Sequence, residues 1–322
     1  MDIVESSFSR RMTRHWNNIN KYNRRTASDN NSCSHCVKKK ISRKAAGKIE
    51  IHGNIDSLDE VDAVLESDAG GIGLFRSEFL YLGRNQLPTE EEQFHTYQQI
   101  LKRMGEKRVI LRTLDIGSDK QADYLHLEKE VNPAMGLRAI RLCFQRPDLF
   151  RTQLRAIYRA SIYGNLGILF PMITSLWELE KVFRICGEVK EKLQTQSMPF
   201  RADVPVGIMI ETPAAALISD CLVKHVNFFS VGTNDLTQYT LACDRQNEQL
   251  ERYCDAHHEA ILRLIEMTAT AAHKHNVWIG ICGELAADKE MTAWFLDHGI
   301  DELSVSPNNV LELRAYVRQL DK

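Results

Sequence analysis

The sequence predicts an α/β protein built as a (β/α)₈ barrel that follows a basic, poorly ordered N-terminal arm. Two observations predict the barrel: eight short runs rich in Val, Ile, Leu and Phe recur after Gly47, and amphipathic stretches of helical period separate them. Near-continuous apolar strands between helices are typical of a parallel sheet covered on both faces. A change of charge near residue 46 sets the arm apart. We therefore expect an arm at 1–46 and one barrel at 47–322.

Composition excludes several classes of protein. The 322 residues carry a formal net charge of −2, with 43% hydrophobic and 26% charged residues, as in ordinary soluble globular proteins. Disordered, collagen-like and disulfide-stapled chains are excluded. No run approaches the ~20 apolar residues of a membrane span. Because no export signal is present and the eight cysteines are scattered, we expect free thiols in a reducing cytoplasm.

The arm is strongly basic. Residues 1–45 carry eleven Lys and Arg against three Asp and Glu, a net +8, so the remainder carries −10. The segment is rich in Asn and Ser and lacks a sustained apolar period, which predicts a solvated tail or linker. Charge alone would also fit a nucleic-acid arm, but nothing else in the chain supports that partner, so none is expected.

The eight apolar runs give the strand order of the predicted barrel. A helical pattern follows most of them, for example at 138–161 and 258–275, and a last helix at 310–320 closes the eighth unit. An open doubly wound sheet is the alternative, but no glycine-rich dinucleotide fingerprint follows the first run. The expected strands are 48–55, 71–77, 109–117, 166–173, 204–211, 226–235, 277–285 and 302–306.

Polar residues gather where these strands end, which is where barrel enzymes hold their active sites. The planar donor fork of arginine suits phosphate and carboxylate groups. Glu211 and Asp235 provide two carboxylates for Mg²⁺, and arginines with Mg²⁺ recur in phosphoryl transfer. The predicted ligand is thus a small, strongly anionic phosphorylated acid, although any single arginine there could be only ion-paired. The strand-end residues are Arg76, Arg112, Asp115, Lys120, Glu211, Asn234, Asp235, Arg245, Cys282 and Glu284.

Cys282 leaves two interpretations open. A lone cysteine in an apolar strand is most often a small buried hydrophobe. Here it stands at the strand end between Gly280 and Gly283, which allow a ligand to approach closely. A thiol in that place suits a general acid that protonates a carbanion or enolate.

Several long motifs follow one another along the chain: GIGLFRSEFLYLGRNQLPTEEEQF, VILRTLDIGSDK, NPAMGLRAIR, ETPAAA, FFSVGTNDLTQYTLACDR and GICGELA. They resemble the C-terminal, phosphoenolpyruvate-binding domain of Enzyme I, the phosphoenolpyruvate–protein phosphotransferase of the bacterial sugar phosphotransferase system, within the family of phosphoenolpyruvate-utilising enzymes. The resemblance runs from about Gly47 to the C-terminus.

The resemblance implies a role for each matching residue. Glu211 and Asp235 would hold the cofactor Mg²⁺, with Asp235 also facing the substrate, and Cys282 would act as the catalytic acid that protonates the enolate as pyruvate leaves. It also implies a cytoplasmic homodimer. The residues implied to bind phosphoenolpyruvate are Arg76, Arg112, Arg245, Asn234, Lys120 and Arg138.

The chain departs from that family in one main respect. It contains no TSH-type phosphohistidine motif, so the resemblance implies a phosphotransferase whose acceptor histidine lies on a separate domain or a phosphocarrier protein in trans. The alternative is a non-catalytic phosphoenolpyruvate-binding dimer or a truncated remnant. A third possibility, carbon–carbon chemistry on pyruvate-like acids, would use the same arginines and Mg²⁺ carboxylates. Smaller departures are Ser118 and the DAHHEAIL segment, which bear on loop geometry only.

Overall fold

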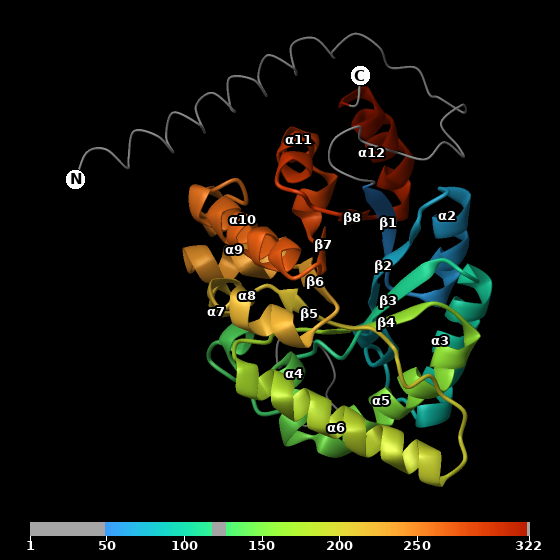
Figure 1. Cartoon of the computed structure of the whole chain (residues 1–322). Helices are drawn as coiled ribbons and strands as arrows, with labels where there is room; N and C mark the ends of the chain where they lie inside the picture. The colour runs from blue at the N-terminus through green and yellow to red at the C-terminus, as the bar shows by residue number, and fades with distance from the viewer. Residues whose placement is uncertain (1–48, 118–126, 321–322) are drawn as a thin grey trace.

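The computed structural model describes residues 49–117 and 127–320, and the expected arm lies outside them. Eight parallel strands pair in sequence order, and the last pairs with the first, so the sheet closes into a barrel. The predicted (β/α)₈ fold is confirmed (Figure 1). The strands are β1 Glu50–Ile55, β2 Gly71–Arg76, β3 Arg108–Arg112, β4 Leu166–Phe170, β5 Val206–Ile210, β6 Phe228–Val231, β7 Trp278–Ile281 and β8 Glu302–Val305.

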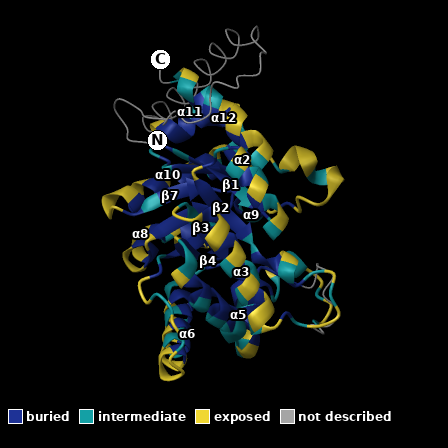
Figure 2. Cartoon of the chain, turned by 90° about the vertical axis from the view of Figure 1, so that its right-hand side faces the viewer, coloured by how far each residue is buried: buried dark blue, intermediate teal, exposed yellow. Residues whose placement is uncertain are grey.

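Helices surround the strands and bury the outer face of the barrel (Figures 1 and 2). None of the described helices is both long and apolar enough to cross a membrane. The α-helices are α2 Val61–Glu66, α3 Glu90–Met104, α4 Ala139–Gln145, α5 Pro147–Ala160, α6 Leu176–Thr195, α7 Pro213–Leu217, α8 Ser219–Leu222, α9 Thr233–Leu241, α10 Glu259–Lys274, α11 Lys289–Asp297 and α12 Pro307–Leu320.

Local sequence explains where these helices begin and break. At α3, the Thr89 hydroxyl accepts from the backbone N–H of Glu92, and the Glu92 carboxylate accepts from the N–H of Thr89, a capping box. The helical pattern at 138–161 forms two helices because Pro147 lacks an N–H and disfavours helical geometry at Arg146, whose φ and ψ are −115° and 69°.

The strands are shorter than the apolar runs that predicted them. The run at 226–235 contains β6 only as far as Val231, and α9 begins at Thr233. Asn234 and Asp235 therefore stand in the first turn of a helix rather than at the end of a strand. Strand pairing ends at Val231 and the chain turns at Gly232, so the polar residues 233–235 belong to the helix that follows and not to the strand.

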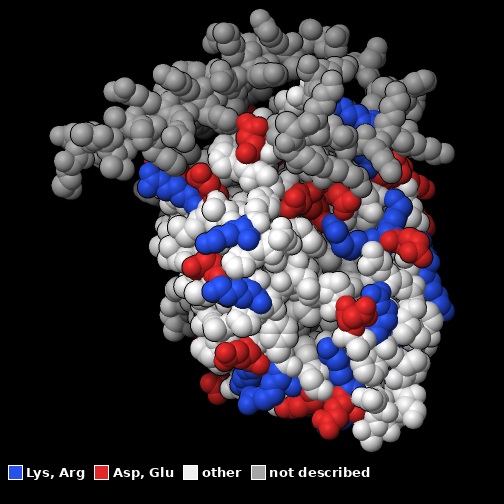
Figure 3. All heavy atoms as spheres, in the orientation of Figure 1, with Lys and Arg blue, Asp and Glu red and all other residues white. Residues whose placement is uncertain are grey.

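Two apolar clusters divide the core. The larger one joins the outer face of the strands to the helices. The smaller one fills the barrel interior with Leu74, Ile110, Leu169, Met209, Phe228 and Cys282, against which Trp278 packs. Figure 3 shows that basic and acidic side chains are interspersed on the outer surface of the face it draws.

A set of charged residues closes the end of the barrel where the strands begin. We call Glu50, His52, Arg108 and Glu302 the floor cluster. Arg108 Nη2 pairs with Glu50 Oε2 at 3.0 Å and also with Glu302, and the buried His52 ring lies 3.1 Å from Glu302 Oε2. The guanidinium stacks 4.3 Å above the ring of Trp278. The single cation of the cluster therefore compensates half of the charge of its two glutamates.

Candidate functional site

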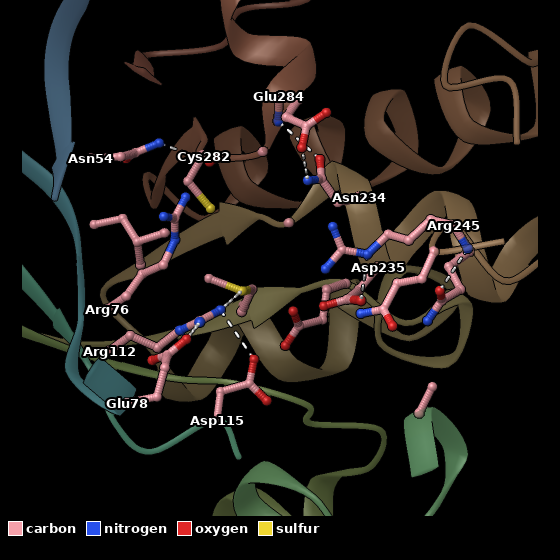
Figure 4. A pocket seen from close by; sticks show the side chains of 18 of the residues that line it. Asn54, Arg76, Glu78, Arg112, Asp115, Asn234, Asp235, Arg245, Cys282 and Glu284 are labelled. Atoms are coloured by element: carbon pink, nitrogen blue, oxygen red, sulfur yellow. Dashed lines mark hydrogen bonds and ion pairs between the residues drawn. The ribbon is translucent and has the colours of Figure 1, made fainter. Parts of the chain in front are cut away.

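A cavity of about 1460 Å³ opens at the other end of the barrel, where the strands end, and we call this end the mouth. Eight of the nine predicted site residues line the cavity, and Lys120 lies outside the described residues. Figure 4 shows side chains from several strands converging there. The eight are Arg76, Arg112, Arg138, Glu211, Asn234, Asp235, Arg245 and Cys282.

Two buried arginines are held by carboxylates. Arg112, the last residue of β3, pairs with Glu78 and lies 3.2 Å from Asp115 Oδ2. Arg138 donates to Asp115 Oδ1 from Nη2 at 2.8 Å and from Nε at 3.2 Å. Burial opposes the charged form, yet these carboxylates raise the pKa of both guanidinium groups above the ordinary value. Both side chains are therefore fixed cations.

Two further arginines are more open to the cavity. Arg76, the last residue of β2, donates to Asp56 Oδ1 at 2.7 Å, and its side chain is 36% exposed. Arg245, in the loop after α9, lies 3.8 Å from Asp235 Oδ1, and its side chain is 42% exposed. Since one carboxylate engages only part of a guanidinium fork, both present N–H groups to a ligand.

Three carboxylates lie close enough to share a metal ion. Ligand oxygens of Asp115, Glu211 and Asp235 all lie within 4.8 Å of one another. Glu211 Oε1 accepts a hydrogen bond from the Met172 N–H at 2.6 Å, and burial, with Asp235 and Asp115 next, raises the pKa of Glu211 to about 8. Asp235 Oδ1 is buried and accepts no hydrogen bond from any described residue. This arrangement suits a divalent cation bound by oxygen ligands.

Cys282 lies just beyond β7 and points into the cavity (Figure 4). It is 4% exposed, and its Sγ lies 3.5 Å from the carbonyl oxygen of Val231. Burial raises the pKa of the thiol to about 11, so the thiol keeps its proton at neutral pH. The group is therefore in the form that a proton donor requires.

Asn234 is tied to the segment that follows Cys282. Its Nδ2 donates to Glu284 Oε1 at 3.0 Å, and its Oδ1 accepts from the Glu284 N–H at 2.9 Å. A Cβ on Gly283 would lie 2.1 Å from Thr233 Oγ1 and 2.7 Å from its backbone nitrogen, so only glycine allows this close approach. The start of α9 and the end of β7 are thus locked together.

The loop that carries Arg245 corrects one expectation. Cys243 and Cys254 form a disulfide across this loop, where their Cα atoms lie 6.0 Å apart, so the expectation of free thiols is wrong for these two. The fold brings together two cysteines that the sequence separates by eleven positions. Among the described residues, Cys143, Cys186, Cys221 and Cys282 are free.

Sequence reasoning did not assign Glu78 or Asp56, which position Arg112 and Arg76. The sequence predicts Asp115 at a strand end, and the structure adds its contacts with Arg112 and Arg138. Glu78 stands two residues after Arg76 in the motif GIGLFRSE, which is the only local signal. Its partner Arg112 lies at the end of β3, so only the tertiary structure shows that the two residues form an ion pair.

Solved structures with a similar fold share little sequence. A protein of the HpcH/HpaI aldolase/citrate lyase family from Burkholderia cenocepacia is 14% identical with a TM-score of 0.51, covering 84% of this chain and 93% of that one. A malate synthase from Haloferax volcanii is 12% identical with a TM-score of 0.53, covering 84% and 69%. At these identities the likeness shows the fold alone.

Sequence relatives are far more similar. The phosphoenolpyruvate-protein phosphotransferase of Priestia megaterium is 50% identical over 274 residues, 85% of this chain and 48% of that one. That of Bacillus subtilis is 48% identical over the same shares. The chain thus spans about half the length of the curated relatives it matches. The family model for the PEP-binding domain of PEP-utilising enzymes matches residues 32–322. With half of its aligned residues shared and a match over nearly its whole length, the chain belongs to the family of phosphoenolpyruvate-utilising enzymes.

Proposed function

We propose that this barrel binds phosphoenolpyruvate with Mg²⁺ and passes the phosphoryl group to a histidine on a separate domain or chain, releasing pyruvate. One observation carries the proposal: four guanidinium groups line the same cavity as the three clustered carboxylates of Asp115, Glu211 and Asp235. Relatives named phosphoenolpyruvate-protein phosphotransferase support the reaction class. The chain would then act as a phosphotransferase of the Enzyme I type.

The arginines provide the anion site. Arg76 and Arg245 present exposed N–H groups from opposite sides of the cavity, and Arg112 lies on the side of Arg76, beside Glu78 and Asp115 (Figure 4). Guanidinium forks bind phosphate and carboxylate oxygens in pairs, so they hold both ends of a phosphorylated acid. Asn234, Arg138 and Lys120 complete the substrate site in this proposal.

The carboxylates fit the metal. Glu211 and Asp235 would hold Mg²⁺, because Asp235 Oδ1 is a buried acceptor with no hydrogen bond from the described residues and Glu211 lies within the same 4.8 Å group. When bound, Mg²⁺ neutralises negative charge on the transferring phosphoryl group. Arg138 lies 3.6 Å from Asp235 Oδ2 and holds that carboxylate in place.

Cys282 completes the reaction. When the P–O bond of phosphoenolpyruvate breaks, the phosphoryl group goes to the histidine nitrogen and the electron pair stays on the enolate oxygen. The S–H bond of Cys282 then breaks as a C–H bond forms at C3, which gives pyruvate. Solvent returns a proton to the thiolate. Because burial raises its pKa to about 11, the thiol still carries its proton at neutral pH when the enolate forms.

Partner proteins would approach the rim of the cavity. Phe79, Val131 and Met135 line it and are exposed, with Val131 95% exposed. Exposed apolar residues around a site are typical of protein-docking surfaces. We propose that a histidine domain or phosphocarrier protein reaches the cavity here, and that the chain is a cytoplasmic homodimer of the sugar phosphotransferase system.

Calorimetric titration with phosphoenolpyruvate, with and without Mg²⁺, tests the binding site. We expect Mg²⁺-dependent heat, and the absence of such heat at millimolar phosphoenolpyruvate would overturn the proposal.

Addition of a separate histidine domain should then release pyruvate. Cys282→Ala should bind phosphoenolpyruvate but turn over about 10²-fold more slowly. Binding without pyruvate release would instead indicate a non-catalytic binder.

A further inference from the structure

Asn54, near the end of β1, connects three strands at the mouth of the barrel. Its Nδ2 donates to the carbonyl oxygen of Cys282 at 3.0 Å and to that of Ser304 at 2.9 Å. Figure 4 shows the amide group of Asn54 directed at the Cys282 backbone. The two contacts cross 228 and 250 positions of sequence, and neither belongs to the backbone pairing of the sheet.

The carbonyl of Cys282 needs such a donor. Backbone pairing between β7 and β8 ends at Ile281 and Leu303, so this carbonyl lies beyond the last paired position. On the other side, the N–H of Cys282 donates to the carbonyl oxygen of Val231 in β6 at 3.0 Å. A buried backbone carbonyl without a donor costs free energy, and the Asn54 amide satisfies it. Both sides of the Cys282 backbone are therefore held.

The orientation of the amide is fixed by its partners. Carbonyl oxygens only accept hydrogen bonds, so the NH₂ group must face Cys282 and Ser304. The Ser304 hydroxyl donates to Asn54 Oδ1 at 2.5 Å. A Cβ on Gly73 would lie 2.2 Å from Ser304 Oγ, so the glycine in β2 makes room for this hydroxyl. The arrangement is a built network rather than a chance contact.

We infer that Asn54 is a positioning residue, which fixes the backbone of Cys282 so that its thiol faces C3 of the enolate in the cavity. The inference rests on the proposed function, because it assigns Cys282 as proton donor. The backbone N–H of Cys282 donates to Val231 in β6, and its carbonyl accepts from the Asn54 side chain in β1. The direction of the thiol depends on this backbone. Loss of the Asn54 contact frees one side, and a misplacement of about 1 Å costs about 10²-fold in rate.

Asn54→Ala tests the inference in the full chain supplied with a histidine domain. We expect kcat for pyruvate release to fall about 10-fold to 100-fold, while KM for phosphoenolpyruvate stays within about 2-fold. Asn54→Asp should lose at least as much, because a carboxylate cannot donate to the two carbonyls. The matched control is Asn165→Ala, which removes an exposed amide that donates to the Glu106 carbonyl away from the mouth. It should change neither constant.

A second measurement does not depend on the proposed reaction. The rate at which iodoacetamide alkylates Cys282, followed by peptide mass spectrometry, should rise several-fold in Asn54→Ala, because the thiol loses its fixed, buried place. If Asn54→Ala does not fold, Ser304→Ala, which removes only the hydroxyl that orients the amide, should show a smaller change in the same direction.

Unchanged kcat with unchanged alkylation overturns the inference. Absence of phosphoenolpyruvate binding in the unaltered chain overturns the proposed function, while the alkylation rate still tests the role of Asn54.

Discussion

At the floor of the barrel two glutamates share a guanidinium, whereas at the mouth Glu211 pairs with no described arginine or lysine. Arg108 contacts both Glu50 and Glu302, and His52 lies between them. Each end holds three groups close enough to ligate a metal ion. At the floor, a cation already fills the space between the carboxylates. The two clusters differ in where their cations lie: Arg108 contacts both floor glutamates, whereas the mouth arginines contact Asp115 and Asp235 and leave Glu211 without an ion pair among the described residues.

The arrangement of the arginines at the mouth explains why Glu211 has no ion pair among the described residues. Arg112 is taken by Glu78 and Asp115, and Arg138 is directed mainly at Asp115. Buried charges cost free energy unless they are paired, so the fold tolerates Glu211 because its raised pKa keeps it partly protonated. The floor is thus built for stability, and the mouth keeps a binding capacity at some cost in stability.

The largest expected effect comes from Glu211→Gln at the mouth. Replacing a metal ligand by an amide of the same shape should lower kcat/KM for phosphoryl transfer about 10³-fold, or about 4 kcal/mol. The free energy of unfolding of the metal-free protein should not fall, because the buried carboxylate is removed. Pyruvate release and urea denaturation measure the two effects. Full activity in this variant would break the comparison.

Arg108→Met is the opposite test, at the floor. Loss of the guanidinium leaves Glu50 and Glu302 without their cation, so the free energy of unfolding should fall by about 3 kcal/mol. The affinity for phosphoenolpyruvate in the presence of Mg²⁺ should not change, because the floor cluster is separate from the cavity lining. Urea denaturation and calorimetry give the two readings. A stable variant with weakened binding would contradict the division of roles.

The pH dependence of stability sharpens the comparison further. The pKa of Glu211 is raised from 4.5 to about 8, so the folded state holds a proton that the unfolded state releases within that window. The free energy of unfolding should therefore be highest below pH 4.5, the pKa of the unfolded state, and should fall as pH rises through the folded-state pKa of about 8. The slope should be at most about 1.4 kcal/mol per pH unit. Thermal midpoints of the metal-free protein should show this slope. Glu211→Gln should flatten it, and a slope retained in that variant would assign it to another group.

His52→Gln should have the smallest effect. The His52 ring nitrogens lie 3.3 Å from Glu50 and 3.1 Å from Glu302 but form no hydrogen bond with a described residue, and an amide offers two N–H donors there, so the loss of stability should not exceed about 1 kcal/mol. Urea denaturation near neutral pH measures it. A loss of about 3 kcal/mol would contradict this minor role and place His52 beside Arg108 in holding the floor cluster together.

Particular residues show how far sequence reasoning reaches. Arg76, Glu211 and Cys282 were expected at strand ends, and the structure places each within one residue of such an end. The expected strand at 226–235 puts Asn234 and Asp235 at its end, but they lie in α9, because pairing stops at Val231 and the chain turns at Gly232. The disulfide between Cys243 and Cys254 was not expected, since loop geometry and not spacing brings them together.

The sequence by itself determined the alternation of eight apolar strands with helices, and it determined which chemical groups follow the strands. Both are local properties, because side-chain period and helix signals act over a few residues. Only the tertiary structure decided which charges compensate one another and which remain for a ligand. Closure of the barrel brings β1 beside β8 and Asn54 to Cys282, and such contacts depend on the strand register and not on distance along the chain.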